Sequence, residues 1–416
     1  MNELIKWINT EEIARIKAGV ECLCVVFEKT DDRIRNIVPD LMPVLYQIFN
    51  LRELPERLRE KVLMLLYLAI NSFSWAERAD DQLIHDCFDS TYEKWLQIFI
   101  EVLQTPPRQH LGMKKYIFKI LTKIFGEIPR YAKQGFAVII QPVWKFMNNT
   151  LPLFIWSVVY GVPVELVEDG MKVAPQGSHT AKPKNIDNDG FELDENIDLS
   201  NEVEAVAVQL IELMQTLLPH KKLRSFVKIG LFPLVNCISH YMLFSKYQEK
   251  TWFEEPNEFQ AEEEDTQNMV SIKKEVLEIL SSLVTNFEDE AIQAIMIISE
   301  KFLANMREEE VYGHLKDVIN KLNNHTSKSA ALSNFDSDKL VAMIQTSHFD
   351  GEHDDHVWKK REIGLLLMGS FAEDIVDFLI RTTPDYNVLT LIEKLVSDFD
   401  NNSKYFLEIT LNKKPP

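Results

Sequence analysis

Glycine is scarce in this sequence, with 13 residues in a chain of 416. Loops that cradle phosphates need closely spaced glycines, and neither GxGxxG nor GxxxxGK occurs. GxSxG and HExxH, which mark hydrolase nucleophiles and zinc proteases, are also missing. Paired carboxylates are frequent, but no apolar pocket is evident around them that would separate their pKa values. We therefore predict a protein that is not an enzyme, with no catalytic residue, no metal and no cofactor.

Long hydrophobic runs are missing as well. The longest, Val62–Ile70 and Leu153–Val162, fall far short of the roughly 20 residues that span a bilayer. The N-terminus lacks the basic start, apolar centre and cleavage site of a signal peptide. The four cysteines form no CxxC pair, and they read as small core residues in a reducing compartment: Cys22, Cys24, Cys87 and Cys237. We expect a soluble intracellular protein with no membrane insertion.

Basic residues are fewer than acidic residues in this chain. The chain holds 45 lysines and arginines against 64 aspartates and glutamates, which gives a net charge of −19. A protein this acidic repels nucleic acid and anionic membranes, and it suits basic protein partners. A simpler explanation is that the acidic surplus only keeps the protein soluble.

Apolar residues recur at helical spacing through most of the chain, whereas the strict alternation of a β-strand is not sustained anywhere. The helices group into pairs, and the shortest intervals between pairs bracket the period of HEAT repeats. Pro39 and Pro43 should bend the second helix of the first pair. The sequence predicts an all-α superhelical α-solenoid of about six HEAT-type antiparallel helix pairs. The predicted elements are 13–50, 54–77 with 82–104, 109–129 with 136–160, 201–218 with 223–250, 268–287 with 289–322, and 357–381 with 386–400.

Polar segments interrupt this array, and their low apolar content predicts flexible insertions. The insertion at 324–356 contains a histidine and carboxylate cluster, 348–356, which matches no zinc spacing and reads as a solvated loop. The predicted organisation is 1–160 for pairs one to three, 161–199 for an acidic insertion, 200–323 for pairs four and five, 324–356 for a polar insertion, and 357–416 for an incomplete last pair and tail.

The stretch 252–265 is the most unusual in the chain, because seven of its fourteen residues are carboxylates and none is basic. Pro256 cannot continue an incoming helix, so the sequence predicts an acidic loop. Trp252, Pro256 and Phe259 are expected to anchor this loop onto the repeats. The candidate cargo-binding residues are Glu254, Glu255, Glu258, Glu262, Glu263, Glu264 and Asp265.

Lysines gather on one predicted helix, at 109–129. Lys115, Lys119 and Lys123 share one face, opposite Ile117, Ile120, Leu121 and Ile124. Lys114 lies on the same predicted helix, and we interpret the basic face of the other three lysines as a solvated outer surface.

Four segments resemble the importin-β superfamily of nuclear transport receptors. The acidic stretch with Trp252, Pro256 and Phe259, followed by Ser271-Ile272-Lys273, is similar to a loop of that family. The helix with Trp358, Arg361, Glu362 and Gly369 is similar to another family motif, as is 38–49. Asp187-Asn-Asp-Gly190 lies where a family member carries a related acidic turn. The four occur in the family's order, over about residues 38–370.

The resemblance implies a HEAT-repeat karyopherin that carries basic cargo, such as histones and ribosomal proteins, into the nucleus. It also implies binding to the GTPase Ran and to phenylalanine-glycine nucleoporins, and shuttling between cytoplasm and nucleus. The chain looks like an internal section of such a receptor, without the N-terminal Ran-binding segment and most C-terminal repeats. The alternative function is a HEAT-repeat scaffold or regulatory subunit of a multiprotein assembly with no transport role.

Overall fold

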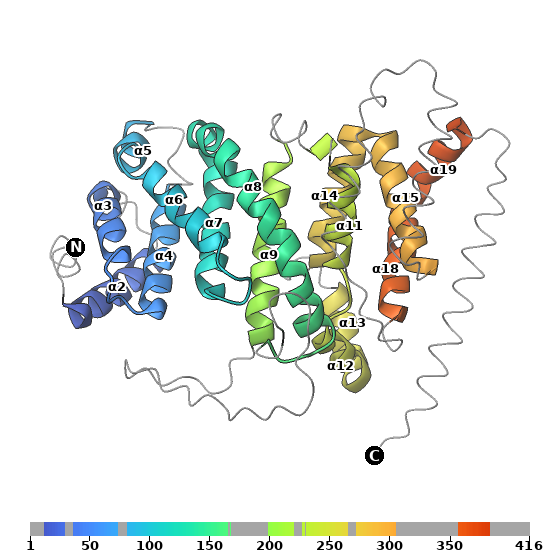
Figure 1. The fold of residues 1–416 in the computed structure, drawn as a ribbon, viewed down its shortest axis with the longest axis horizontal. Helices are drawn as coiled ribbons and strands as arrows, with labels where there is room; N and C mark the ends of the chain where they lie inside the picture. The colour runs from blue at the N-terminus through green and yellow to red at the C-terminus, as the bar shows by residue number, and fades with distance from the viewer. Residues whose placement is uncertain are drawn as a thin grey trace. The chain divides into compact units, whose positions relative to one another are not determined.

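The chain, seen here as a computed structural model, is built of α-helices joined by turns and irregular segments (Figure 1). No β-strand occurs among the residues that the structure describes, so the all-α prediction is confirmed. Two compact units divide the chain, Met1–Leu217 and Leu218–Pro416, and each is treated by itself below. The described residues are 12–29, 36–73, 81–164, 167, 199–219, 227–228, 230–264, 272–304 and 357–382.

Unit 1 consists of helices packed in two layers. In the first layer α2, α4, α7 and α9 lie in a row, each against the next. In the second layer α3 packs on α4 and α5, while α6 and α8 pack on each other and on α7. The helices are α2 (Ile13–Glu28), α3 (Val38–Phe49), α4 (Glu56–Asn71), α5 (Asp81–Phe88), α6 (Tyr92–Leu103), α7 (Leu111–Glu127), α8 (Pro129–Phe154), the π-helical turn η2 (Ile155–Val159) and α9 (Leu199–Leu217).

The core of unit 1 lies between these layers. Helix α7 buries Ile117, Phe118 and Leu121 completely, at the spacing that places residues on one side of a helix. An amphipathic helix gains most of its stability from such a buried stripe, since its backbone hydrogen bonds are nearly balanced by those with water. The repeated layer contacts therefore follow from the apolar periodicity of the sequence.

Unit 2 is organised around α15, which contacts α11, α14, α18 and α19. Helices α12 and α13 follow α11 and contact each other. Gly364 of α18 permits a close approach to α15, because a Cβ there would lie 2.9 Å from Leu303 Cγ and 3.0 Å from the Ser299 carbonyl oxygen. The helices are α11 (Leu231–His240), α12 (Lys246–Glu254), α13 (Pro256–Glu264), α14 (Ile272–Phe287), α15 (Asp289–Ala304), α18 (Val357–Ser370) and α19 (Ala372–Thr382).

Three predicted long helices are in fact broken. The helix predicted at 82–104 divides into α5 and α6, 223–250 contains α11 and α12, and 357–381 divides into α18 and α19. At the second of these breaks, Tyr241, Met242, Leu243 and Phe244 are all buried. These four residues form a buried turn between α11 and α12, so the apolar run does not continue the helix. The predicted helix at 386–400 lies outside the described residues.

Pro39 lies in the first turn of α3, where the missing amide hydrogen has no intrahelical acceptor and the proline requires no bend. Pro43 lies inside the same helix. The insertions predicted at 161–199 and 324–356 fall almost entirely outside the described residues.

The solvated lysine face predicted on α7 is also wrong. Lys114 is fully buried, and Lys115, Lys119 and Lys123 are half-buried because α7 packs against α4, α8 and α9. The Lys119 Nζ lies 5.6 Å from the centre of the Tyr67 ring on α4. Long lysine stems can cover apolar neighbours while the ammonium group reaches outward, which a face-by-face reading of one helix does not capture.

Three cysteines are buried as predicted, namely Cys24, Cys87 and Cys237, whereas Cys22 is exposed. Burial raises the pKa of the Cys237 thiol to about 12, so this side chain remains a neutral core residue. Among the described helices, none has the length and apolar character to cross a membrane.

Candidate binding surface

The acidic stretch 252–265 is mainly helical, and the loop prediction is wrong. Helix α12 ends at Glu254, and α13 begins directly at Pro256. Proline fits the first position of a helix, because its φ angle is already helical and its missing N–H needs no partner there. The Phe259 N–H donates to the Glu255 carbonyl oxygen at 3.0 Å and so closes the first turn of α13. The proline that ends one helix therefore starts the next.

The start of α12 is fixed by a capping box. The Ser245 hydroxyl accepts from the Gln248 backbone N–H at 3.1 Å, and the Gln248 side chain accepts from the Ser245 N–H at 2.9 Å. Two backbone donors that the helix itself cannot satisfy thus gain partners. Such caps contribute about 1 kcal/mol each and set where the helix begins.

A buried ion cluster connects α12 to α18. The Lys359 Nζ of α18 lies 3.1 Å from Glu249 Oε2 of α12, and their side chains are 1% and 9% exposed. Lys246 approaches the same oxygen at 3.2 Å. Burial would raise the pKa of Glu249, but the two lysines hold it below its usual value. Burial lowers the pKa of Lys359 to about 8, against the opposing effect of Glu249.

Phe244, in the turn before α12, contacts residues of three helices: α13, α14 and α18. Its ring centre lies 5.5 Å from that of Phe259 on α13 and 5.5 Å from that of Trp358 on α18. The Lys273 Nζ of α14 lies 4.7 Å from the Phe244 ring centre and 3.0 Å from Glu362 Oε1. Aromatic pairs and cation–π contacts of this geometry each contribute roughly 0.5–1.5 kcal/mol. The structure thus brings several motif residues together around a residue that the sequence placed within a helix.

The other residues selected from the sequence differ in their burial. Trp252 is half-buried, with its ring centre 4.9 Å from that of Phe253. Arg361 is half-buried on α18, and Pro256 is exposed. A Cβ at Gly369 would meet nothing within 4 Å, so packing does not require glycine there. The anchoring role of Trp252, Pro256 and Phe259 stays a prediction.

The exposed residues of α12, α13 and the residue between them include carboxylates and aromatic rings. Glu254, Glu255 and Glu258 are exposed, and Tyr247 and Phe253 on α12 are 59% and 44% exposed. A hydrogen bond with Glu258 and the repulsion of its charge raise the pKa of Glu255. We call these five residues the α12–α13 surface.

The remaining predicted binding residues, Glu262, Glu263 and Glu264, belong to the last turn of α13, and nothing is described of their side chains. Asp265 and the cluster 348–356 lie outside the described residues. Within the described part of the chain, no three histidine, cysteine or carboxylate side chains come together in a way that could hold a metal ion.

No protein-family model matches this chain. The chain is distantly similar to a member of the importin-β family. That protein is importin-9 of Drosophila melanogaster, with 20% identity over 268 residues, which are 64% of this chain and 24% of importin-9. The chain thus spans about a quarter of the length of this curated relative. The resemblance predicted from the four sequence segments is confirmed as a distant one.

Proposed function

We propose that this chain is part of an importin-like receptor that binds basic protein cargo, such as histones and ribosomal proteins, on the α12–α13 surface. The observation that carries the proposal is a carboxylate-rich hairpin on a buried, ion-paired base, in a chain similar to importin-9. The two-layer packing of unit 1 supports the further proposal that the helices are HEAT-type pairs of a solenoid.

Buried contacts hold the hairpin in place, and its exposed carboxylates are available to a partner. The pair Glu249–Lys359 and the ring cluster at Phe244 hold the hairpin, so its exposed groups lose little freedom when a partner binds. Glu254, Glu255 and Glu258 would steer a basic segment toward the surface. The rings of Tyr247 and Phe253 would then stack against arginine guanidinium groups.

The same similarity leads us to propose the receptor's other partners. Ran would regulate cargo release, and phenylalanine-glycine nucleoporins would carry the receptor through the nuclear pore between cytoplasm and nucleus. These partners belong to the proposal for the whole receptor rather than to a surface described above.

Charge neutralisation on the hairpin tests the proposal. The triple variant Glu254→Gln, Glu255→Gln, Glu258→Gln should weaken binding of core histones by roughly three- to tenfold at low salt, since three exposed pairs of about 0.2–0.5 kcal/mol each would be lost. The loss should shrink at physiological salt, where the screening length is about 8 Å. Binding is measured by fluorescence titration of labelled histones at several salt concentrations.

A matched control removes the same charge elsewhere. Glu93, Glu101 and Glu373 are exposed carboxylates outside the hairpin, and their triple change to glutamine should leave histone affinity within about twofold. Equal losses in both triple variants would contradict a local binding surface and leave only the general attraction of an acidic protein. If the unmodified chain bound histones no more tightly than a neutral protein of similar size, the result would instead favour a scaffold function.

A further inference from the structure

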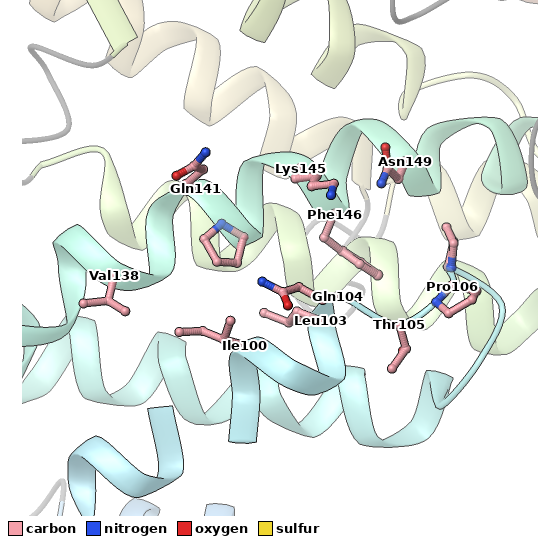
Figure 2. A pocket seen from close by; sticks show the side chains of 12 residues that line it. Ile100, Leu103, Gln104, Thr105, Pro106, Val138, Gln141, Lys145, Phe146 and Asn149 are labelled. Atoms are coloured by element: carbon pink, nitrogen blue, oxygen red, sulfur yellow. The ribbon is translucent and has the colours of Figure 1, made fainter. Parts of the chain in front are cut away.

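A second surface lies in unit 1, between α6 and α8, and none of the predicted binding residues belongs to it. It is a groove of about 570 Å³ (Figure 2). Ile100 and Leu103 of α6 line one wall, and Val138, Pro142 and Phe146 of α8 line the other. The last three are spaced by four residues, which places them along one side of the helix. The groove therefore has an apolar interior.

One apolar side chain in this groove is unusually open to solvent. Val138 is 52% exposed, whereas Leu103 and Phe146, deeper in the same groove, are only 3% and 2% exposed. A single exposed valine is ordinary, but a valine at the mouth of an apolar groove offers surface that a partner side chain could cover. A covered apolar side chain gains about 25 cal/mol for each Å² removed from water.

Three amide side chains line the same groove: Gln104, Gln141 and Asn149. All three are exposed, so their amide groups are accessible to a partner. An amide offers one carbonyl acceptor and two N–H donors, which are the groups that pair with a peptide backbone. Figure 2 shows the Gln104 amide lying between the two helices. The polar part of the groove thus matches an extended chain rather than a compact ion.

The charge in the groove is positive, in contrast to the chain as a whole. Lys145 is the only ionisable residue in the lining, and it is exposed. The buried ammonium of Lys114 lies behind the wall, 5.1 Å from the centre of the Phe146 ring. It donates to the carbonyl oxygens of Pro106 at 2.7 Å and Pro107 at 3.3 Å, two residues that line the groove. Because the described lining holds one ammonium group and no carboxylate, the groove favours an anionic partner.

We propose that the α6–α8 groove binds an extended peptide segment of a partner protein that carries an apolar side chain and a carboxylate. The apolar side chain covers Val138 and the wall of the groove, the amides pair with the peptide backbone, and the carboxylate meets Lys145. From Val138 to Asn149 the helix rises about 16 Å, which an extended chain covers with about five residues. This partner differs in charge from the basic cargo proposed for unit 2, so neither proposal depends on the other.

Selection of peptides by the full-length chain tests the inference. A displayed library of random peptides of about eight residues, slightly longer than the groove, is selected on the immobilised protein. We expect enrichment of sequences that hold an aspartate or glutamate near an aliphatic or aromatic residue. Enrichment of basic peptides, of uncharged peptides, or of none would overturn the proposal.

Charge reversal at Lys145 then tests whether the selected peptide binds in the α6–α8 groove. Lys145→Glu should weaken its binding about tenfold, as expected for the loss of a charge pair at an interface. Lys133→Glu is the matched control, because Lys133 is exposed on the same helix but does not line the groove, and this variant should change the affinity by less than twofold. A peptide with lysine in place of its carboxylate should bind Lys145→Glu better than the unmodified chain. Equal effects of the two variants, or no recovery of binding by the swapped peptide, would contradict recognition of the peptide carboxylate by Lys145.

Discussion

The α6–α8 groove of unit 1 and the α12–α13 surface of unit 2 each have a fully buried lysine beside them, and the two lysines are stabilised in different ways. Lys114 is 0% exposed and donates to backbone carbonyl oxygens at 2.7–3.4 Å. Lys359 is 1% exposed and meets the carboxylate of Glu249. A buried ammonium group needs compensation, which dipoles or an opposite charge can provide.

The two solutions have different consequences for the surface nearby. Carbonyl oxygens of residues 105–107 accept from Lys114 behind the groove, and Lys145 in the lining makes the groove positive. The carboxylate of Glu249 opposes the charge of Lys359, so the exposed side chains, which are Glu254, Glu255 and Glu258 with Lys246 and Lys250, decide the sign of the hairpin.

The largest expected effect comes from breaking the carboxylate-compensated pair. Lys359→Met should destabilise unit 2 by about 3–5 kcal/mol, because Glu249 would stay buried with only Lys246 beside it. The double variant Lys359→Met, Glu249→Leu should recover most of that loss, since it removes both buried charges. Hydrogen exchange of the α12 and α18 amides measures the change within unit 2. A double variant as unstable as the single one would show that the pair itself, rather than the uncompensated carboxylate, supplies the stability.

We expect a smaller loss of stability when Lys114, whose ammonium group donates to carbonyl oxygens, is replaced. Lys114→Met should destabilise unit 1 by about 1–3 kcal/mol, because the carbonyl oxygens that accept from its ammonium group would lose their donor. These acceptors are neutral, and no carboxylate is among the hydrogen bonds described for this ammonium group. Methionine keeps most of the volume of the lysine stem, so cavity formation contributes little. Hydrogen exchange of the α6 and α7 amides provides the measurement. A loss as large as that of Lys359→Met would remove the distinction between the two modes of compensation.

Acid should distinguish the two units further. His240 of unit 2 is buried, its Nδ1–H donates to the Asn236 carbonyl oxygen at 2.6 Å, and burial lowers its pKa to about 3. The folded pKa lies below the unfolded value of about 6.5, so the neutral ring contributes stability that is fully present above pH 6.5. That stability declines as the pH falls from 6.5 toward 3, by about 1.4 kcal/mol at pH 5.5.

The histidines described in unit 1 are less buried, with side-chain exposures of 20% for His85 and 31% for His110. We therefore expect hydrogen exchange to rise first in α11 and α15 when the pH is lowered. His240→Leu should reduce this acid sensitivity, although it also removes the hydrogen bond to Asn236. Unchanged acid sensitivity in that variant would assign the effect to other groups.

Part of the binding surface could be found from composition and motif alone. The run of glutamates after Trp252 is visible in the sequence, and so are the segments around Trp358 and Glu362 that resemble the importin-β family. Their meeting at Phe244 could not be found, because the apolar run 241–244 continues the helical pattern on either side of it. The groove between α6 and α8 was missed for a related reason. Gln104, Gln141 and Lys145 carry no motif, and only packing gives them a common surface.

The sequence by itself determined the all-α class and most helix positions, because helical periodicity and the scarcity of glycine are local properties. It also determined the acidic character of 252–265. Only the tertiary structure decided that Pro256 begins a helix, that Lys114 is buried, and that Lys359 pairs with Glu249. The physical reason is that the cost of burying a charge depends on which groups lie beside it, and those neighbours come from helices that the sequence keeps far apart.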